Sequence, residues 1–331
     1  MDSDQPFSSL TPDGVMDAVD SVGLAPDGRL LALNSFENRV YQIGMEEGPP
    51  LVAKFYRPDR WSDAAILEEH AFVADLADRE IPVVPPLSLA GGTLHRFAGF
   101  RFALFEKHGG RAPELDAPDT LEWLGRFIGR IHAVGAVSSY QHRPRLDIES
   151  FGSEPRDYLL SHDFIPADIR TVWHSVADQA LAGVRRSFAD AGKTRGLRLH
   201  GDCHVGNVLW TDGGATRGPH FVDFDDSRMG PAVQDLWLLL SGERTEMTRQ
   251  LKLLLSGYRR FCDFDPRELR LIEALRTLRL IHYSAWIARR WQDPAFPPAF
   301  PWFNTQRYWQ DRILELREQV ALMDEPPLEL D

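Results

Sequence analysis

The chain has 331 residues, of which 43% are hydrophobic and 26% are charged. This composition is typical of a folded globular protein and excludes a disordered or fibrous chain, and the length predicts two lobes or one large domain with an insertion. Acidic residues outnumber Lys and Arg by 49 to 37, which gives a formal net charge of -12. Because such a field repels phosphate backbones and anionic lipids, we expect neither nucleic acid nor a membrane as a partner.

Cysteine usage and the first residues bear on the compartment. Cys203 and Cys262 are the two cysteines of the chain and stand in unlike contexts, which argues against a disulfide framework and fits a reducing environment. The acidic stretch 1–14 lacks the basic and apolar regions of a signal peptide, and no run of about 18 apolar residues follows it. We therefore expect a cytoplasmic protein, and we expect it to be monomeric.

The first part of the chain is rich in strand patterns. Residues 31–44 and 49–58 flank the short connection MEEGPP and predict antiparallel strands, the second ending near Lys54. Apolar residues at helical spacing then predict a helix that Ser62 caps and IPVVPP ends. A hairpin over 92–106 follows, and residues 105–108 are expected to connect two lobes.

Beyond this connection the periodicity becomes helical. Apolar residues at helical spacing predict helices over residues 120–137, 167–188, 232–242, 251–261 and 269–291. The sequence therefore predicts an α+β fold with a β-rich nucleotide-binding lobe, residues 1–107, and a helical catalytic lobe, residues 108–331.

The segment LRLHGDCHVGNVLW carries the strongest functional signal. Gly201 and Gly206 permit sharp bends, so Asp202 and Asn207 can converge on one site. A carboxylate can accept the proton of an attacking hydroxyl, and an amide oxygen can bind a hard cation such as Mg²⁺. His-x-Asp-x-x-x-x-Asn is also the spacing of the protein-kinase catalytic loop.

Three further residues complete the pattern of a phosphotransferase. Asp223 follows an apolar strand in HFVDFDDS and is expected to hold the metal together with Asn207. Lys54 ends the strand LVAK, in the manner of the lysine that binds ATP phosphates in kinases. Glu69 on the following helix is the expected ion-pair partner of Lys54, and Glu68 is the alternative, about 100° away around the helix.

The segments HGDCHVGNVLW, FVDFDDSRMGPAVQDLW, LNSFENRVYQI and VAKFYRPDRW resemble the stress response kinase A family. These are bacterial serine/threonine protein kinases with the aminoglycoside-phosphotransferase-like fold, and the resemblance runs nearly end to end. It implies Asp202 as the catalytic base, Asn207 and Asp223 as Mg²⁺ ligands, Lys54 on the α- and β-phosphates, and Ser35 in the loop over the ATP phosphates.

Two features depart from ordinary protein kinases. The loop NSFENR has no G-x-G-x-x-G and must hold phosphate differently, for example through Ser35 Oγ and backbone N–H groups. His-Gly-Asp replaces His-Arg-Asp, and no A-P-E follows Asp223, so we expect no switch by phosphorylation of an activation loop.

The resemblance implies an ATP- and Mg²⁺-dependent kinase that phosphorylates a protein on Ser or Thr, with autophosphorylation as one outcome and stress survival as its setting. The alternatives are a kinase of small alcohols on the same fold, acting on an aminoglycoside, choline or homoserine, and a pseudokinase that only binds nucleotide. The motifs alone do not distinguish a protein kinase from a kinase of small alcohols.

Other polar residues of these segments are more often structural. His200 and Cys203 are expected to pack within the loop, and Asp235 to cap its helix or to brace the catalytic loop. Asp225 and Asp226 are expected to cap or to face solvent rather than to bind metal. Tryptophans 286, 291, 302 and 309 are expected to pack rather than to form a substrate platform.

Overall fold

The N-terminal lobe is built on one antiparallel sheet. The computed structural model describes residues 5–213 and 217–330, and within them five strands pair in the order β1-β2-β3-β5-β4. These strands are Pro26–Ala32 (β1), Arg39–Met45 (β2), Leu51–Phe55 (β3), His95–Phe97 (β4) and Phe100–Glu106 (β5). Along β5, Phe100, Phe102 and Leu104 alternate inward and are at most 2% exposed, as a strand with one face on a core requires.

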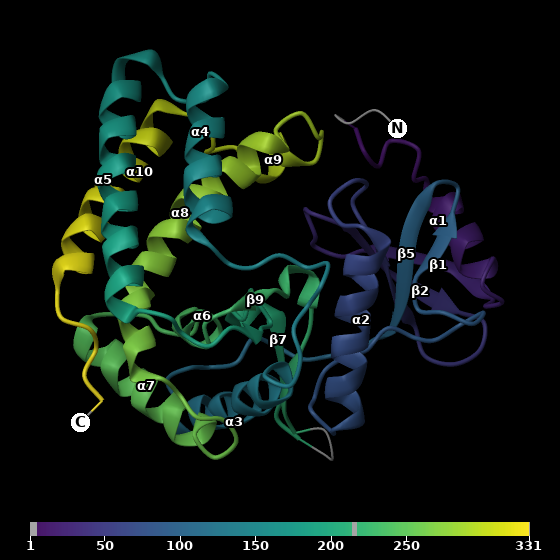
Figure 1. Cartoon of the computed structure of the whole chain (residues 1–331). Coiled ribbons are helices and arrows are strands. Elements are labelled where there is room, and N and C mark those ends of the chain that lie inside the picture. Colours follow the sequence, from purple (N-terminus) through teal and green to yellow (C-terminus); the bar gives the residue numbers. More distant parts are fainter. Residues whose placement is uncertain (1–4, 214–216, 331) are drawn as a thin grey trace.

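Two helices flank this sheet. Helix α1 (Pro12–Asp20), which the sequence analysis did not predict, packs on it through Val15 and Val19. Helix α2 (Asp63–Asp78) begins as predicted at Ser62, whose hydroxyl accepts the Ala65 N–H at 3.1 Å. Figure 1 shows α2 between the sheet and the helical lobe, so this helix can present side chains to both.

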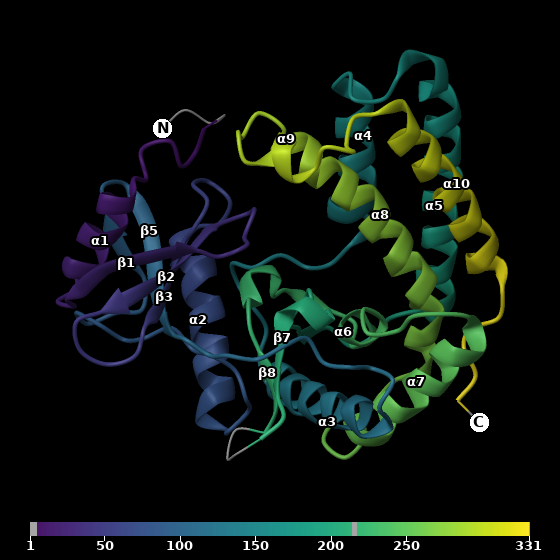
Figure 2. The same ribbon diagram turned by 180° about the vertical axis from the view of Figure 1, so that it is seen from behind.

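The C-terminal lobe is helical, and the predicted two-lobed α+β fold is confirmed. Its helices are Pro118–Gly135 (α3), Glu154–Ser161 (α4), Ala167–Ala191 (α5), Val233–Trp237 (α6), Arg244–Tyr258 (α7), Ile272–Arg289 (α8), Phe296–Ala299 (α9) and Gln306–Asp324 (α10). Helix α10 was not predicted, and the predicted loop 294–302 contains the short helix α9. In Figure 2, α8 leads to α9, which lies on the side of the helical lobe that faces the N-terminal lobe.

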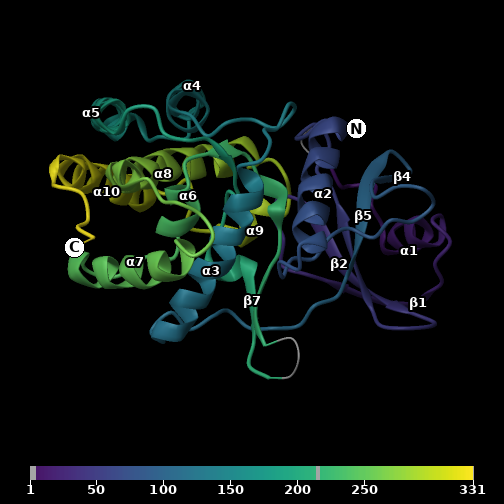
Figure 3. The same cartoon turned by 60° about the horizontal axis from the view of Figure 1, so that its bottom comes forward.

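Helices α3 and α7 pack backbone to backbone. A Cβ at Gly125 would collide with the carbonyl oxygen of Leu254, and one at Gly257 would collide with that of Glu122. Glycine therefore lets the two helices approach more closely than larger side chains allow. Figure 3 shows this pair on one side of the catalytic segment.

Two short antiparallel strand pairs flank the segment that carries the HGD motif. Strand β6 (Leu197–Arg198) pairs with β9 (Met229–Gly230), and β7 (Val208–Thr211) pairs with β8 (Gly218–Phe221). The predicted turn between β7 and β8 includes residues 214–216, which lie outside the described residues. Because β6 precedes the HGD segment and β8 precedes Asp223, the two pairs hold both loops beside each other.

Within the described part of the chain, no helix combines the length and apolarity needed to cross a bilayer.

Candidate active site

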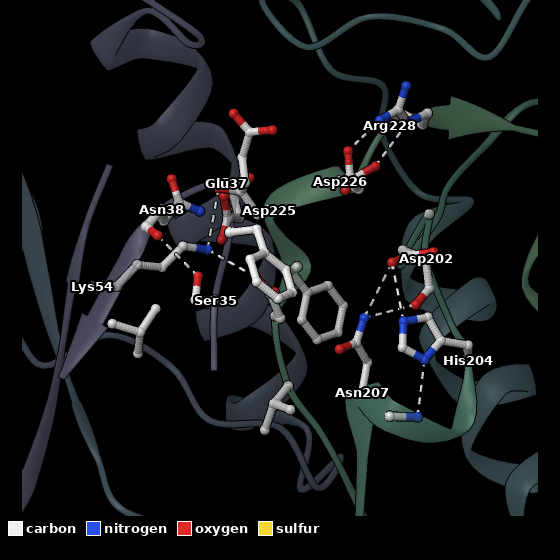
Figure 4. Close-up of a pocket in the computed structure, with 18 of the residues that line it drawn as sticks. Ser35, Glu37, Asn38, Lys54, Asp202, His204, Asn207, Asp225, Asp226 and Arg228 are labelled. Carbon is white, nitrogen blue, oxygen red and sulfur yellow. Dashed lines mark hydrogen bonds and ion pairs between the residues drawn. The ribbon is translucent and has the colours of Figure 1, made fainter. Parts of the chain in front are cut away.

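A cavity of about 1040 Å³ lies between the two lobes. Its lining brings together all the predicted site residues, namely Ser35, Lys54, Glu69, Asp202, Asn207 and Asp223. Figure 4 shows Lys54 and Ser35 entering from the side of the sheet, opposite Asp202 and Asn207 on the predicted catalytic loop, residues 200–207. Residues far apart in the sequence therefore meet on one cavity.

The catalytic loop is held in shape by buried polar contacts. Gly201 has a φ of +90°, and a Cβ there would collide with the carbonyl oxygen of Asp226, so glycine is required. The carboxylate of Asp235 accepts the N–H groups of His200 and Gly201 at 2.8 and 2.9 Å. It also pairs with buried His132 at 2.9 Å. The expectation that Asp235 braces the loop is confirmed.

The expected packing roles of His200 and Cys203 are confirmed as well. His200 is 1% exposed, and its Nε2 lies 3.0 Å from the carbonyl oxygen of Val222. Cys203 is also 1% exposed, and burial raises the pKa of its thiol well above the ordinary value. A buried thiol that stays protonated is a poor nucleophile.

Both carboxylate oxygens of Asp202 have partners. Arg279 Nη1 donates to Oδ1 at 2.7 Å, and His204 Nε2 lies 3.3 Å from Oδ2. Burial would raise the pKa of Asp202, but the hydrogen bond from His204 and the positive charge of Arg279 outweigh it and hold this pKa below its ordinary value. Asp202 is therefore an ionised hydrogen-bond acceptor at neutral pH.

Asn207 is oriented by the same loop. Its Nδ2 donates to the backbone oxygen of Asp202 at 2.9 Å, which leaves its Oδ1 as an acceptor. Gly206 lies in a tight 3-10 turn, Val205–Asn207, so the chain bends here as predicted, although without a positive φ. A Cβ at Gly206 would meet the ring of His204, whose Nδ1 accepts the Gly206 N–H at 2.9 Å.

Lys54 connects the sheet to the segment after β8. Its Nζ lies 2.9 Å from Asp223 Oδ1 and 3.2 Å from Asp225 Oδ1. Burial alone would lower the pKa of Lys54, but these two carboxylates raise it well above its ordinary value. Asp223 has a left-handed backbone, with φ 62°, and its side chain is 55% exposed in the cavity. Asp adopts this conformation more readily than most residues.

The predicted direct ion pair between Lys54 and Glu69 is not formed. Glu69 Oε2 instead accepts from Arg143 Nη2 at 2.6 Å, because Lys54 is drawn to the two aspartates. Burial raises the pKa of Glu69, and the charge of Lys54 opposes this, so the two groups still interact. Glu68 points elsewhere and accepts backbone N–H groups such as that of His142 at 2.9 Å.

Asp225 and Asp226 belong to a network of ion pairs rather than to a cap or a solvated surface. Arg60 contacts Asp225 Oδ2 at 2.7 Å and Asp226 Oδ1 at 2.8 Å. Burial alone would raise the pKa of both carboxyls, but the charge of Arg60 is among the causes that hold each at about 2. Arg60 also pairs with Glu37 at 3.3 Å. It therefore joins the loop between β1 and β2 to the segment that carries Asp223.

The loop that contains Ser35 is closed against the helical lobe. Ser35 Oγ donates to the backbone oxygen of Asn38 at 3.1 Å. Glu37 accepts from Trp286 Nε1 at 2.6 Å and pairs with Arg290 at 2.7 Å, and Phe36 packs on Phe300. We call these contacts of Phe36 and Glu37 with the α8–α9 region the loop clamp.

Tryptophan packing was predicted correctly only in part. Trp309 is fully buried against Trp173, but Trp302 is 44% exposed and Trp286 lines the cavity. Sequence reasoning also missed Glu37, Arg60, Arg143 and Arg279. No local motif marks these four, because each acquires its partner only when distant segments pack.

The fold and the site define a phosphotransferase of the kinase-like class, which has a strand-built lobe, a helical lobe and a cavity between them. The chain belongs to the phosphotransferase enzyme family, whose model matches residues 29–272. It is 44% identical to stress response kinase A of Escherichia coli (strain K12) over 98% of this chain and 97% of that protein. It is 43% identical to the serine/threonine protein kinase RdoA of Salmonella typhimurium (strain LT2) over the same shares. The chain is therefore a kinase of this family.

Solved structures share the fold at lower identity. A structure of the amicoumacin kinase hAmiN has a TM-score of 0.70 at 22% identity and covers 96% of this chain and 95% of its own. A microcompartment-associated aminopropanol kinase has a TM-score of 0.68 at 18% identity, with 94% and 96% covered. At these identities the likeness establishes the fold.

Proposed function

We propose that this protein transfers the γ-phosphoryl group of ATP to a Ser or Thr hydroxyl of a protein, with Mg²⁺, as part of a bacterial stress response. The observation that carries the proposal is the meeting of Lys54, Asp202, Asn207 and Asp223 on one cavity. The 43% identity to a relative named a serine/threonine protein kinase supports the protein substrate.

The residues present suit a magnesium ion that binds together with a nucleotide. Among the described residues, no group of three His, Cys, Asp or Glu side chains is placed to hold a metal by itself. Mg²⁺ in kinases needs few protein ligands, because the nucleotide phosphates supply the others. Asn207 Oδ1 and the exposed carboxylate of Asp223 are suitable donors. The ion would neutralise charge on the transferring phosphoryl group.

The side chains of the chain itself have distinct tasks in this reaction. Lys54 stays charged and presents its ammonium group to the nucleotide phosphates. Asp202 accepts a hydrogen bond from the acceptor hydroxyl and orients its oxygen for in-line attack. The closed loop with Ser35 covers the cavity, and exclusion of water strengthens each electrostatic contact within it.

A kinase of small alcohols is the second candidate, because structural neighbours carry names such as aminopropanol kinase and spectinomycin phosphotransferase. A pseudokinase is the third, and the full set of Lys54, Asp202, Asn207 and Asp223 argues against it.

Labelled ATP separates the three candidates. The protein is incubated with it alone, with generic protein substrates, and with a panel of small alcohols that includes choline, homoserine and an aminoglycoside. The proposal expects label on Ser or Thr, either of added protein or of the kinase itself. Label confined to a small alcohol would support the second candidate, and no transfer at all would support the third.

A further inference from the structure

The half of the cavity that faces the acceptor has a distinctive wall. Helix α8 lines it with Arg279, Tyr283 and Trp286, and Arg276 lies one turn before Arg279. Of the cavity-lining side chains that the structure describes on α8 and the catalytic loop, Asp202 is the one carboxylate. The wall beside the catalytic base is therefore cationic and aromatic, although the whole chain is acidic.

Three other carboxylates that line the cavity already have cationic partners. Glu37 is paired with arginines at 57, 60 and 290, and Glu69 is paired with Arg143 at 2.6 Å. Asp225 is paired with Lys54 and Arg60. None of these three acids contacts Arg279, whose ion-pair partner is Asp202 at 2.7 Å, whereas Arg276 is paired with Glu273 at 3.2 Å.

Arg279 differs from the other arginines that line this cavity. Its side chain is 42% exposed, whereas those of Arg60 and Arg228 are 13% and 8% exposed. Within the described part of the chain, its hydrogen bonds are made to Asp202 through Nη1 alone. Nη2 and Nε remain as donors at the cavity surface, in the planar geometry that suits a second carboxylate.

We infer that Arg279 selects the acceptor, by binding an acidic side chain that lies next to the Ser or Thr to be phosphorylated. This inference rests on the proposed protein-kinase function. When the acceptor hydroxyl reaches Asp202, the free edge of the Arg279 guanidinium pairs with the neighbouring carboxylate. A basic residue in the same place meets the like charge of Arg279 and is disfavoured.

The test uses peptides that differ in one residue. Each contains a single Ser, with Glu, Gln or Lys placed at one of two positions on either side. We measure kcat/KM for each peptide with the full-length wild type and with R279Q, R279K and R307Q. The readout is the ratio of kcat/KM for the Glu peptide to kcat/KM for the matching Gln peptide. Arg307 is the matched control, because its side chain is 90% exposed on α10, away from the cavity lining.

We expect the wild type and R307Q to favour Glu by about tenfold at one position or more, and to disfavour Lys. R279Q should lose this preference, and R279K should keep part of it because the charge remains. Loss of Arg279 also removes a contact that orients Asp202 and can lower kcat for every peptide. The ratio of the two peptides is unaffected by such a general loss. Equal use of the Glu and Gln peptides by the wild type, or an unchanged preference in R279Q, would overturn the inference while leaving the kinase function intact. If the peptides take no label and a small alcohol does, the proposed function fails as well.

Discussion

Lys54 Nζ on β3 lies 2.9 Å from Oδ1 of Asp223, a residue of the other lobe. The pair spans the cleft and brings the cation for the nucleotide phosphates next to the carboxylate proposed to bind metal. In this pair the charges of the ammonium group and of the carboxylate compensate each other. The consequences of this arrangement can be tested residue by residue.

The substitution D223N should weaken nucleotide binding only when Mg²⁺ is present. Asn tolerates the left-handed backbone of this position, so the change removes charge without straining the loop. We expect the dissociation constant for ADP with Mg²⁺ to rise about tenfold or more, which corresponds to about 1.4 kcal/mol. Calorimetry with and without Mg²⁺ measures both values. Equal losses under the two conditions would show that Asp223 does not act through a metal.

The substitution D202N should remove catalysis and spare nucleotide binding. General-base and orienting groups contribute roughly 10²- to 10⁴-fold to rates, and we expect kcat to fall by that factor while ATP affinity changes little. D212N is a suitable control, because Asp212 is 65% exposed and pairs with Arg111 on the surface. Turnover by D202N at the wild-type rate would exclude Asp202 as the base.

The loop clamp should contribute to nucleotide affinity. Arg290 Nη2 pairs with Glu37 at 2.7 Å, so R290Q should loosen the loop over the phosphates and raise KM for ATP several-fold. Its neighbour Arg289 is exposed and lies over the ring of Tyr158 instead. R289Q should therefore leave KM unchanged. If both variants behave alike, closure of this loop has no part in binding ATP.

Glu268 should make stability depend on pH. It is 2% exposed, and burial raises its pKa to about 7, although the Val233 N–H donates to it at 2.9 Å. The pKa of Glu268 is therefore higher in the folded state than its value of about 4.5 in the unfolded state. The free energy of unfolding is then highest below about pH 4.5 and falls as the pH rises to about 7. At 1.36 kcal/mol per pKa unit, the free energy of unfolding falls by roughly 3 kcal/mol over this range.

The substitution E268Q removes this titration. Its melting temperature at pH 8 should exceed that of the wild type by several degrees, and the two proteins should differ little at pH 5. E318Q, at an exposed position on α10, should match the wild type at both pH values. A destabilised E268Q at pH 8 would mean that the carboxylate is held in its charged form.

The sequence predicted most of the strands, helices and site residues whose positions are set by short segments of chain. Lys54 lies within a strand, and Asp202, Asn207 and Asp223 follow a strand or stand in a tight loop, so local spacing sets their position. Helix α10 was not predicted, because its buried residues, such as Ile313 and Leu316, stand among many charged ones.

The partners of the charged residues could not be predicted in the same way. Arg143 meets Glu69 across 74 residues of sequence, and Arg279 meets Asp202 across 77. The first contact depends on how the two lobes pack and the second on how α8 packs against the catalytic loop, and no local pattern encodes either. The expected Lys54–Glu69 pair failed for this reason, since Asp225 arrives from the other lobe and competes for the ammonium group.

The most direct test of the central claim is a crystal structure with a non-hydrolysable ATP analogue and Mn²⁺ in place of Mg²⁺, with the ion located by its anomalous scattering. The account predicts a peak bound by Asn207 Oδ1 and the Asp223 carboxylate, with the γ-phosphate facing Asp202. A nucleotide or metal bound elsewhere, with Asn207 and Asp223 untouched, would contradict it.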